Sequence, residues 1–396
     1  MSVNPNRTRL LLCSSSMEAG GSERQMLYLM QYLDRSRFDL SLYLLYPKGS
    51  LLEEVPEDVA VYSYWGDRSP PRWNWPGRIF ADQVRHLTQH LRSHPVDLVY
   101  DRLFHMALIA GPAAKRTQTP RIATLVSPPN EDVVRSEKRW LAWKKRALRR
   151  SYLSAQGLLA VGSETAASAA LFYNIPRERF RIVTSPIDVK RIESSAQMPW
   201  ENSSLDLRCK QVIAIGRQSD EKGHRYLIEA MALYQKFVEQ GDAPPVVVHL
   251  VGDGVLRKEL ESLTDSLGLR GSVLFHGVQA NPYSLLAKSD LMVLPSLYEG
   301  LPNVVLEAML CRVPVLATNT PGGAGELFRR TGLGQLVARC SATEIANAMR
   351  RRFSDPDPWL APLEAARQYI LENHSMDRWI GELSDLFESL RRRGSH

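Results

Sequence analysis

Short apolar runs alternate with amphipathic stretches along nearly the whole chain, and this alternation limits the possible fold more than any other feature. Several of the runs, among them RLLLCS, VVVHLVG and DLMVLPS, consist almost entirely of apolar residues. Strands that are buried on both faces of a parallel sheet have this composition. Helical patterns lie between most of the runs, which is the βαβ order of doubly wound sheets. The sequence therefore predicts an α/β fold.

The alternation stops once, over residues 188–210, where DVKRIESSAQMPWENSSLDLRCK has no sustained period. We interpret this segment as a linker between two α/β halves, and a length of 396 residues fits such a division. The predicted domains are 1–190 and 191–374, with a C-terminal helix at about 375–393 that packs back on the first domain. Ligands of open α/β sheets bind beyond the carboxyl ends of the strands, so we expect two Rossmann-like domains that face each other across a cleft.

Composition places the chain among soluble globular proteins, since 44% of its residues are hydrophobic and 23% are charged. No run approaches the roughly 18 uncharged apolar residues of a spanning helix, and the N-terminal apolar run is too short for a secretory signal. A formal net charge of +7 is compatible with nucleic acid, an anionic membrane or small anionic substrates as partners. We expect reduced thiols in a cytoplasmic protein, because the cysteines lack metal-type spacing: Cys13, Cys209, Cys311 and Cys340.

Two cations follow the first predicted strand of the second half, in AIGRQSDEKGHRYLIEA. Gly216 ends the strand, and Arg217 and Lys222 precede an amphipathic helix. A glycine at a strand end lets the backbone approach a ligand. Two cations at that position suit a pyrophosphate, because each charged hydrogen bond contributes roughly 1.5–3 kcal/mol. A solvated loop with surface charges is the alternative interpretation.

A short helix that begins near a proline is predicted in YEGLPNVVLEAML. Pro302 suits the first helical turn, and the amides of residues 303–305 would then point outward at the positive end of the helix dipole. Such a helix start favours an anion. Glu307 lies one turn inside the helix, where its carboxylate is suited to a ribose diol, and Glu299 lies on the preceding loop. The alternative is that both glutamates only stabilise the helix start, by well under about 2 kcal/mol.

These segments resemble a known family. Glu299 and Glu307, in SLYEGLPNVVLEAM, match the E-x7-E motif of retaining glycosyltransferases of the family-4 type, which have the GT-B fold. GRQSDEKG, LVGDGVLRKELESL, VLFHGVQ and PGGAGELF…GLGQLV are similar to further segments of this family. In the first half, SSSMEAGGSERQMLYLMQYL resembles its glycine loop and GLLAVGSETAASAALFYNIPRERFRIVTSPID the end of its first domain. The resemblance covers nearly the full chain and carries no information about the sugar.

The resemblance implies a role for each candidate residue. Arg217 and Lys222 would bind the donor phosphates, and Glu299 would contact the donor sugar near the reaction centre. His105, in YDRLFHMALIAG, would face the sugar, although an ordinary core or helix-start histidine is the alternative. The implied contacts to donor phosphates, ribose and base, together with the glycine loop that closes over the donor, are Gly20, Gly21, Gly216, Gly252, Gly277, Val278, Gly300, Leu301, Pro302, Asn303, Val304 and Glu307.

A retaining transfer requires positive charge near the leaving nucleoside diphosphate, and Arg217, Lys222 and the helix dipole would supply it without a metal. A double displacement would need two carboxylates about 5 Å apart across the sugar, and only Glu299 is a clear candidate. We therefore expect transfer on one face, in which the departing phosphate accepts the proton of the acceptor. Asp355 and Asp357 lie in a proline-rich connector, so we expect no metal site and no cofactor apart from the nucleotide-sugar substrate.

Eight cations lie between residues 135 and 150, in RSEKRWLAWKKRALRRSYL. On a helical wheel the apolar residues of this stretch share about half of the circumference, and every cation except Lys144 lies on the other half. A helix at an anionic membrane has this pattern, with about 1 kcal/mol from each cation, and a core-packed helix with a solvated basic face is the alternative. Because many members of the resembled family act on lipid-linked acceptors, we favour peripheral membrane contact through Trp140, Trp143, Lys144, Lys145, Arg146 and Arg149.

The sequence therefore predicts a retaining glycosyltransferase that moves a sugar from a nucleotide-diphosphate donor, with a UDP-sugar favoured, to a glycan or lipid-linked acceptor. Its pathway would be polysaccharide or glycolipid biosynthesis, at the inner face of the plasma membrane. A nucleotide-sugar epimerase is an alternative that needs no acceptor. A basic nucleic-acid-binding protein is a further class, but no recognised motif supports it and it leaves the phosphate-sized site unexplained. The acidic and basic site residues argue against an inactive donor-binding relative.

Overall fold

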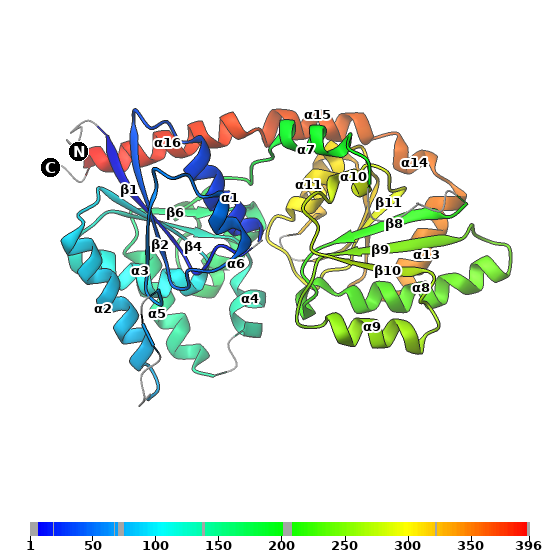
Figure 1. The fold of residues 1–396 in the computed structure, drawn as a ribbon, viewed down its shortest axis with the longest axis horizontal. Coiled ribbons are helices and arrows are strands. Elements are labelled where there is room, and N and C mark those ends of the chain that lie inside the picture. The colour runs from blue at the N-terminus through cyan, green and yellow to red at the C-terminus, as the bar shows by residue number, and fades with distance from the viewer. Residues whose placement is uncertain are drawn as a thin grey trace. The chain divides into compact units, whose positions relative to one another are not determined.

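The chain folds into two compact units, residues 1–185 with 377–396 and residues 186–376, and each is a parallel sheet with helices on both faces (Figure 1). The sequence analysis placed a division after residue 190 and the return to the first unit at about 375. The computed structural model describes residues 7–18, 20–66, 68–69, 75–136, 139–200, 208–320 and 323–393.

The first unit contains one parallel sheet. Its strands are β1 (Thr8–Ser14), β2 (Phe38–Leu44), β3 (Ala60–Ser63), β4 (Leu98–Arg102), β5 (Arg121–Leu125), β6 (Gly157–Ala160) and β7 (Phe180–Ile182). They lie in the order β3-β2-β1-β4-β5-β6-β7. Leu10 pairs with Leu40 on one side and Leu98 on the other, and all three side chains are buried. Continuous apolar strands therefore form the centre of the sheet, as their sequences predict.

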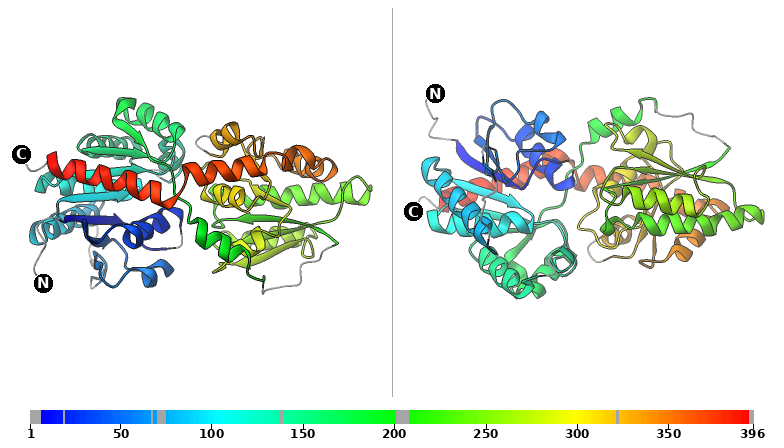
Figure 2. Two further views of the ribbon diagram at one scale, coloured as in Figure 1. Left: turned by 90° about the horizontal axis from the view of Figure 1, so that it is seen from above. Right: turned by 60° about the horizontal axis from the view of Figure 1, so that its bottom comes forward.

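Helices cover both faces of this sheet. They are α1 (Gly21–Tyr32), α2 (Arg78–Ser93), α3 (Phe104–Thr117), α4 (Pro129–Ser136), α5 (Leu141–Leu153), α6 (Ser163–Tyr173) and the C-terminal α16 (Met376–Arg393). Figure 2 shows α16, in red, lying across the first unit. The ring of Phe387 packs edge-to-face on the rings of Phe38 and Tyr100, and Arg37 forms an ion pair of 2.8 Å with Glu388. The last helix of the chain thus completes the core of the first unit.

The second unit is built in the same way. Its strands are β8 (Lys210–Ile215), β9 (Val246–Val251), β10 (Val273–Gly277), β11 (Leu291–Leu294), β12 (Val315–Thr318) and β13 (Gln335–Val337), in the order β10-β9-β8-β11-β12-β13. Its helices are α7 (Val189–Ala196), α8 (His224–Glu239), α9 (Arg257–Ser266), α10 (Tyr283–Leu286), α11 (Asn303–Leu310), α12 (Gly325–Thr331), α13 (Ala342–Ser354), α14 (Asp357–Leu360) and α15 (Leu363–Asn373).

Part of the predicted linker is a helix. The helix α7 occupies the first third of the segment 188–210, where the side chain of Asp188 accepts a hydrogen bond of 3.1 Å from the amide of Arg191. Ile192 of this helix is 3% exposed and belongs to the core of the second unit. The interpretation of the whole segment as a linker is therefore wrong. Residues 201–207 of the same segment lie outside the described residues.

The predicted basic helix over 135–152 is also divided. The helix α4 ends at Ser136 and α5 begins at Leu141, while residues 137 and 138 lie outside the described residues. Trp140 has φ of 62°, a left-handed conformation that cannot continue a right-handed α-helix. In the described part of the chain no helix is long and apolar enough to cross a membrane.

Candidate active site

In the second unit, the predicted donor residues gather where parallel strands end. Arg217 and Lys222 follow β8, and Glu299 follows β11. These two strands are neighbours in the sheet, and the chain proceeds from them toward opposite edges. A topological switch point of this kind is the usual ligand-binding position of an open α/β sheet. The strand order therefore brings together cations and a carboxylate that are far apart in the sequence.

Lys222 and Glu299 form an ion pair at this point. The distance from Lys222 Nζ to Glu299 Oε1 is 2.7 Å, and Ser296 Oγ donates a hydrogen bond of 2.7 Å to the same oxygen. The two charged side chains are 24% and 10% exposed, so the pair is only partly screened by water. The amide of Leu297 also donates to the carbonyl of Glu221 at 2.8 Å. The loops after β8 and β11 are consequently fixed to each other.

Arg217 remains directed to solvent. Its side chain is exposed, and within the described part of the chain no carboxylate pairs with it. It directly follows Gly216, whose amide donates to the carbonyl of Val251 at 2.9 Å. The guanidinium charge therefore sits at the edge of the sheet and is available to an anion.

The backbones of Gly216, Gly252 and Gly277 lie close to one another at the strand ends that precede these cations. The amide of Gly252 donates to the carbonyl of Gly277 at 2.7 Å. Gly252 has φ of 126°, and a Cβ added there would lie 2.1 Å from the carbonyl oxygen of Gly216. Only glycine fits such a close approach at this backbone conformation. Val278 follows Gly277 and is 69% exposed, as a residue that contacts a planar base could be.

The start of α11 differs in detail from its prediction. Pro302 is the residue before the helix and has ψ of 103°, so the helix begins at Asn303. The amide of Val305 donates to the carbonyl of Pro302 at 3.0 Å and is therefore not available to a ligand, contrary to the sequence interpretation. Among the residues described, the amides of Asn303 and Val304 have no acceptor. The side-chain oxygen Oδ1 of Asn303 is also buried with no hydrogen-bond partner there. The amides of Asn303 and Val304 therefore remain available to an anion at the positive end of the helix dipole.

Glu307 lies in the second turn of α11 and is half-buried. The hydroxyl of Tyr283, at the start of α10, donates a hydrogen bond of 3.4 Å to its Oε1. This contact orients the carboxylate. Gly300 and Leu301 connect Glu299 to the helix start, so all of the predicted residues between positions 299 and 307 belong to one short loop and helix.

Sequence reasoning missed three residues of this site: Ser296, Tyr283 and His224. His224 begins α8 and is 4% exposed, and its Nδ1 has no partner among the described residues. Burial, with a smaller contribution from the charge of Lys222, lowers the pKa of His224 to about 4, so the ring is neutral at pH 7. Its position directly after Lys222-Gly223 was the only signal in the sequence.

The first unit has an equivalent switch point between β1 and β4. Gly20 and Gly21 follow β1, and Gly20 is the residue that precedes α1. Arg102, at the end of β4, is 3% exposed and donates from Nε to Ser22 Oγ at 3.1 Å. The glycine loop is thereby connected to the neighbouring strand end. The sequence did not indicate Arg102.

His105 lies on the same edge of the first sheet. It is the second residue of α3 and its side chain is exposed, so it is a histidine at a helix start, as one alternative had it, and not a core histidine. Its ring lies 4.0 Å from the ring of Phe104. Leu103, directly before the helix, has φ of 69°, which is strained for a bulky residue. Such strain is common at functional sites.

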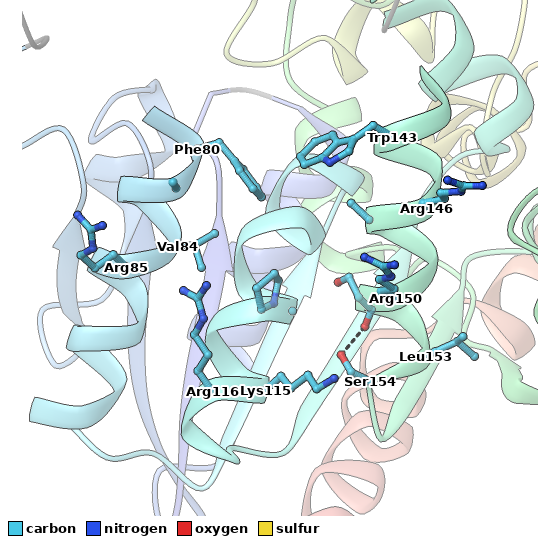
Figure 3. A pocket seen from close by; sticks show the side chains of 15 residues that line it. Phe80, Val84, Arg85, Lys115, Arg116, Trp143, Arg146, Arg150, Leu153 and Ser154 are labelled. Atoms are coloured by element: carbon cyan, nitrogen blue, oxygen red, sulfur yellow. Dashed lines mark hydrogen bonds between the residues drawn. The ribbon is translucent and has the colours of Figure 1, made fainter. Parts of the chain in front are cut away.

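The residues predicted to contact a membrane do not share one face of α5. Trp140 and Trp143 are 70% and 50% exposed, although the helical wheel placed them on the apolar side. The Nζ of Lys145 lies 4.5 Å from the ring centroid of Phe172, and Arg149 Nε donates to the carbonyl of Asn174 at 3.4 Å. Lys145 and Arg149 therefore face α6 and its end. Lys144 is half-buried and Arg146 is exposed, and Figure 3 shows the ring of Trp143 and the guanidinium of Arg146 pointing to different sides of the helix.

Within the described ranges, no group of three or more His, Cys, Asp or Glu side chains is placed to hold a metal ion.

The fold and the two switch-point sites define a GT-B architecture of two Rossmann-like domains. Anabaena Alr3699/HepE, solved in complex with UDP-glucose, shares this fold with a TM-score of 0.77 and 21% identity, and the match covers 97% of this chain and 100% of that chain. Residues 19–191 match the family "Glycosyltransferase Family 4" and residues 201–370 match "Glycosyl transferases group 1". The chain belongs to the family-4 type of GT-B glycosyltransferases.

Curated relatives match over parts of their length. An N-acetylgalactosamine-N,N'-diacetylbacillosaminyl-diphospho-undecaprenol 4-alpha-N-acetylgalactosaminyltransferase of Campylobacter jejuni is 30% identical over 183 residues, which is 46% of this chain and 47% of that enzyme. A 2-deoxystreptamine glucosyltransferase of Streptomyces kanamyceticus is 26% identical over 311 residues, which is 73% of this chain and 76% of that enzyme. The match to the Campylobacter protein thus spans about half of its length.

Proposed function

We propose that this chain is a retaining glycosyltransferase that moves a sugar from a nucleotide-diphosphate donor, with a UDP-sugar favoured, to a glycan or lipid-linked acceptor in polysaccharide or glycolipid biosynthesis. One observation carries the proposal: Lys222 and Glu299 form an ion pair at the switch point of the second sheet, and this pair connects the loop that contains Arg217 with the loop that leads into α11. The UDP-glucose complex of the Anabaena protein supports the choice of donor. The name of the Campylobacter relative supports a lipid-linked acceptor.

The proposed donor pose follows the strand ends. Arg217, Lys222 and the amides of Asn303 and Val304 bind the diphosphate, because cations and helix-start amides favour anions. Glu307 accepts hydrogen bonds from the ribose diol. The remaining predicted contacts, to the base and to the loop before α11, are Gly216, Gly252, Gly277, Val278, Gly300, Leu301 and Pro302. Gly20, Gly21 and His105 keep their predicted roles in the first unit as donor contacts.

The proposed reaction breaks the bond between the anomeric carbon and the phosphate oxygen and forms a bond from the same face to the acceptor oxygen. The departing phosphate oxygen takes the proton of the acceptor hydroxyl. Negative charge grows on the diphosphate as the first bond breaks, and Arg217 and Lys222 stabilise that charge. Glu299 holds the ammonium of Lys222 in position before the donor binds, which lowers the cost of orienting it in the transition state. We propose that this chemistry needs no metal.

A two-stage assay tests the function. Thermal-shift measurements with a panel of nucleotide sugars identify the stabilising donor, and turnover is then measured on lipid-linked and free glycan acceptors in EDTA. We expect a UDP-sugar to stabilise the protein and the product to keep the anomeric configuration of the donor. Inversion at the anomeric carbon would contradict the mechanism. Conversion of the donor without any acceptor would indicate an epimerase instead.

We also propose that the first unit contacts an anionic membrane at the start of α5, through the exposed rings of Trp140 and Trp143. Nucleic acid is not a proposed partner. Flotation with phosphatidylglycerol vesicles tests the contact. Binding that does not depend on the anionic lipid would contradict it.

A further inference from the structure

Two hydrogen bonds converge on one oxygen of the Glu299 carboxylate. Lys222 Nζ and Ser296 Oγ each lie 2.7 Å from Oε1. The other oxygen, Oε2, accepts no hydrogen bond from the described residues. The side chain of Glu299 is only 10% exposed, but Oε2 is not among its fully buried atoms and so reaches solvent. The carboxylate therefore keeps one accepting oxygen open to a ligand.

Lys222 alone cannot fix the position of this carboxylate. Its ammonium is a compact charge on a flexible stem, so it can follow the carboxylate through many arrangements. The last torsion of a glutamate side chain is broad as well, and the plane of the carboxylate turns easily. An ion pair between two flexible side chains keeps the charges together, but it does not fix either oxygen in space. A fixed position requires a second, rigid donor.

Ser296 is such a donor. It is fully buried, it lies two residues beyond the end of β11, and its hydroxyl is attached to a short side chain. Its carbonyl accepts a hydrogen bond from the hydroxyl of Thr318, at the end of the neighbouring strand β12. The amide of Leu297 donates to the carbonyl of Glu221 at 2.8 Å, and its carbonyl accepts from Arg339 Nη1 at 3.0 Å. The backbone that carries the Ser296 hydroxyl is therefore fixed on both sides.

A second buried serine of the same unit provides a comparison. Ser289 is 8% exposed, and its hydroxyl donates to the backbone carbonyl of Leu285 at 2.8 Å. Such a local bond to the backbone is the usual way to satisfy a buried serine hydroxyl. Ser296 instead gives its one proton to a charged side chain of the candidate site. The two serines therefore have different tasks, although both are buried.

We propose that Ser296 is a positioning residue that fixes the carboxylate of Glu299, so that Oε2 accepts a hydrogen bond from one hydroxyl group of the donor sugar. The inference rests on the proposed function, in which Lys222 binds the diphosphate. A carboxylate beside that ammonium repels phosphate oxygens, so the neutral sugar is the part of the donor that suits it. A site built to bind one hydroxyl group rejects a donor that lacks it. Ser296 thereby determines how strictly the site selects its sugar.

Calorimetric titration with UDP-glucose, and with analogues that each lack one hydroxyl group of the glucose, tests the inference without an acceptor. In wild type, one analogue should bind at least about tenfold more weakly than UDP-glucose, because the lost hydrogen bond is to a charged group. In S296A this ratio of affinities should fall by at least about threefold, since the carboxylate is no longer fixed before the donor binds. The matched control S289A removes a buried hydroxyl elsewhere and should keep the ratio within about twofold.

The ratio of affinities separates positioning from general damage to the site. A purely structural role of Ser296 would weaken UDP-glucose and the analogue by the same factor and leave their ratio unchanged. UDP lacks the sugar, so its affinity should agree within about twofold among wild type, S296A and S289A. An unchanged ratio in S296A would overturn the proposal. A wild type that binds every analogue as tightly as UDP-glucose would overturn it as well, and this result requires no variant.

The effect of Ser296 should also require Glu299. E299A removes the carboxylate, and S296A/E299A should have the same ratio of affinities as E299A alone. A further change in the double variant would show that Ser296 acts independently of the carboxylate and would overturn the proposal. Transfer assays distinguish the inference from the proposed function. An unchanged ratio in S296A together with normal sugar transfer by wild type would refute the positioning role and leave the function intact. The expected ratios without any sugar transfer would refute the function and leave the positioning role intact.

Discussion

The sequence predicted that Lys222 and Glu299 belong to the candidate site, but it did not predict that they form a pair. The residues Lys222 and Glu299 are 77 positions apart, and the sequence assigned one to the phosphates and the other to the sugar. Their contact follows from the adjacency of β8 and β11, which no local pattern specifies. Ser296, which donates to the same carboxylate oxygen, belongs to no recognisable motif. Strand order therefore determines the electrostatics of this site.

The pairing predicts non-additive kinetics for K222A and E299Q. We expect each variant to lower kcat with UDP-glucose by about 10²-fold, because removal of a positioned charge in a catalytic site has effects of this size. The double variant should lose much less than the product of the two factors, since the residues act as one unit. Steady-state kinetics of the three variants measure the coupling. Independent, multiplicative losses would show that the contact has no role in the reaction.

At the scale of elements, periodicity located most strands and helices but not every boundary. Continuous apolar strands such as Leu291–Leu294 were evident because both of their faces are buried. The break before α5 was not, since no glycine or proline marks it and Trp140 adopts the left-handed conformation unexpectedly. The helix α7 was missed because it buries only Ile192. A groove between α2 and α5 was also invisible, because its lining comes from three separate segments.

A buried ion pair connects elements of the first unit and gives a stability prediction. Arg121 of β5 contacts Asp101 of β4 at 2.5 and 2.8 Å and donates to the carbonyl of Ser151 on α5 at 3.0 Å. Burial raises the pKa of Asp101 despite the neighbouring guanidinium. Loss of Arg121 would leave a carboxyl group buried without its partner, so R121A should lower the free energy of unfolding by about 3–5 kcal/mol.

Urea denaturation of R121A measures this effect, with R9A as the control. Arg9 also forms an ion pair, with Asp97 at 2.8 Å, but its side chain is 40% exposed. Exposed pairs contribute at most about 1 kcal/mol, so R9A should change the midpoint only slightly. Equal destabilisation by the two variants would contradict the account of the buried pair.

For the whole molecule, buried histidines couple stability to pH. Burial lowers the pKa to about 4 for three histidines, His90, His224 and His249. Nearby positive charge lowers each pKa further: His94 and His86 act on His90, Lys222 acts on His224, and His276 acts on His249. The unfolded chain takes up protons at these positions below about pH 6.5, and the folded chain does not until near pH 4. Stability is therefore highest above pH 6.5 and should fall as the pH decreases from 6.5 to 4.

Each of these histidines contributes up to about 1.4 kcal/mol per pH unit within that window. Urea midpoints at pH 7.5, 6 and 5 measure the slope. H90F removes one titrating group from an aromatic cluster that includes Tyr62. It should therefore reduce the dependence of the urea midpoint on pH by the contribution of one histidine. A midpoint that is constant from pH 7.5 to 5 would show that the folded and unfolded chains bind equal numbers of protons in this range, and it would contradict the prediction.

The sequence predicted the fold class and the family because two independent patterns agreed. One is the alternation of strands and helices along the chain, and the other is the set of family motifs at the ends of the predicted strands. The sequence also located the residues of the donor site along the chain. It could not show which cations have structural partners and which do not, because this depends on packing between helices. Among the described residues, that distinction separates Lys145 and Arg149, which have partners near α6, from Arg146 and Arg150 on the same helix.

The central claim is that a diphosphate binds where Arg217 and Lys222 meet the start of α11. Calorimetric titration of wild type and R217A with UDP-glucose and with uridine tests it most directly, with R225A as the control because Arg225 is an exposed cation of α8 paired with Glu229. We predict that R217A binds UDP-glucose at least about tenfold more weakly than wild type or R225A, while uridine affinity is equal in all three. Equal affinity of R217A and wild type for UDP-glucose would contradict the claim.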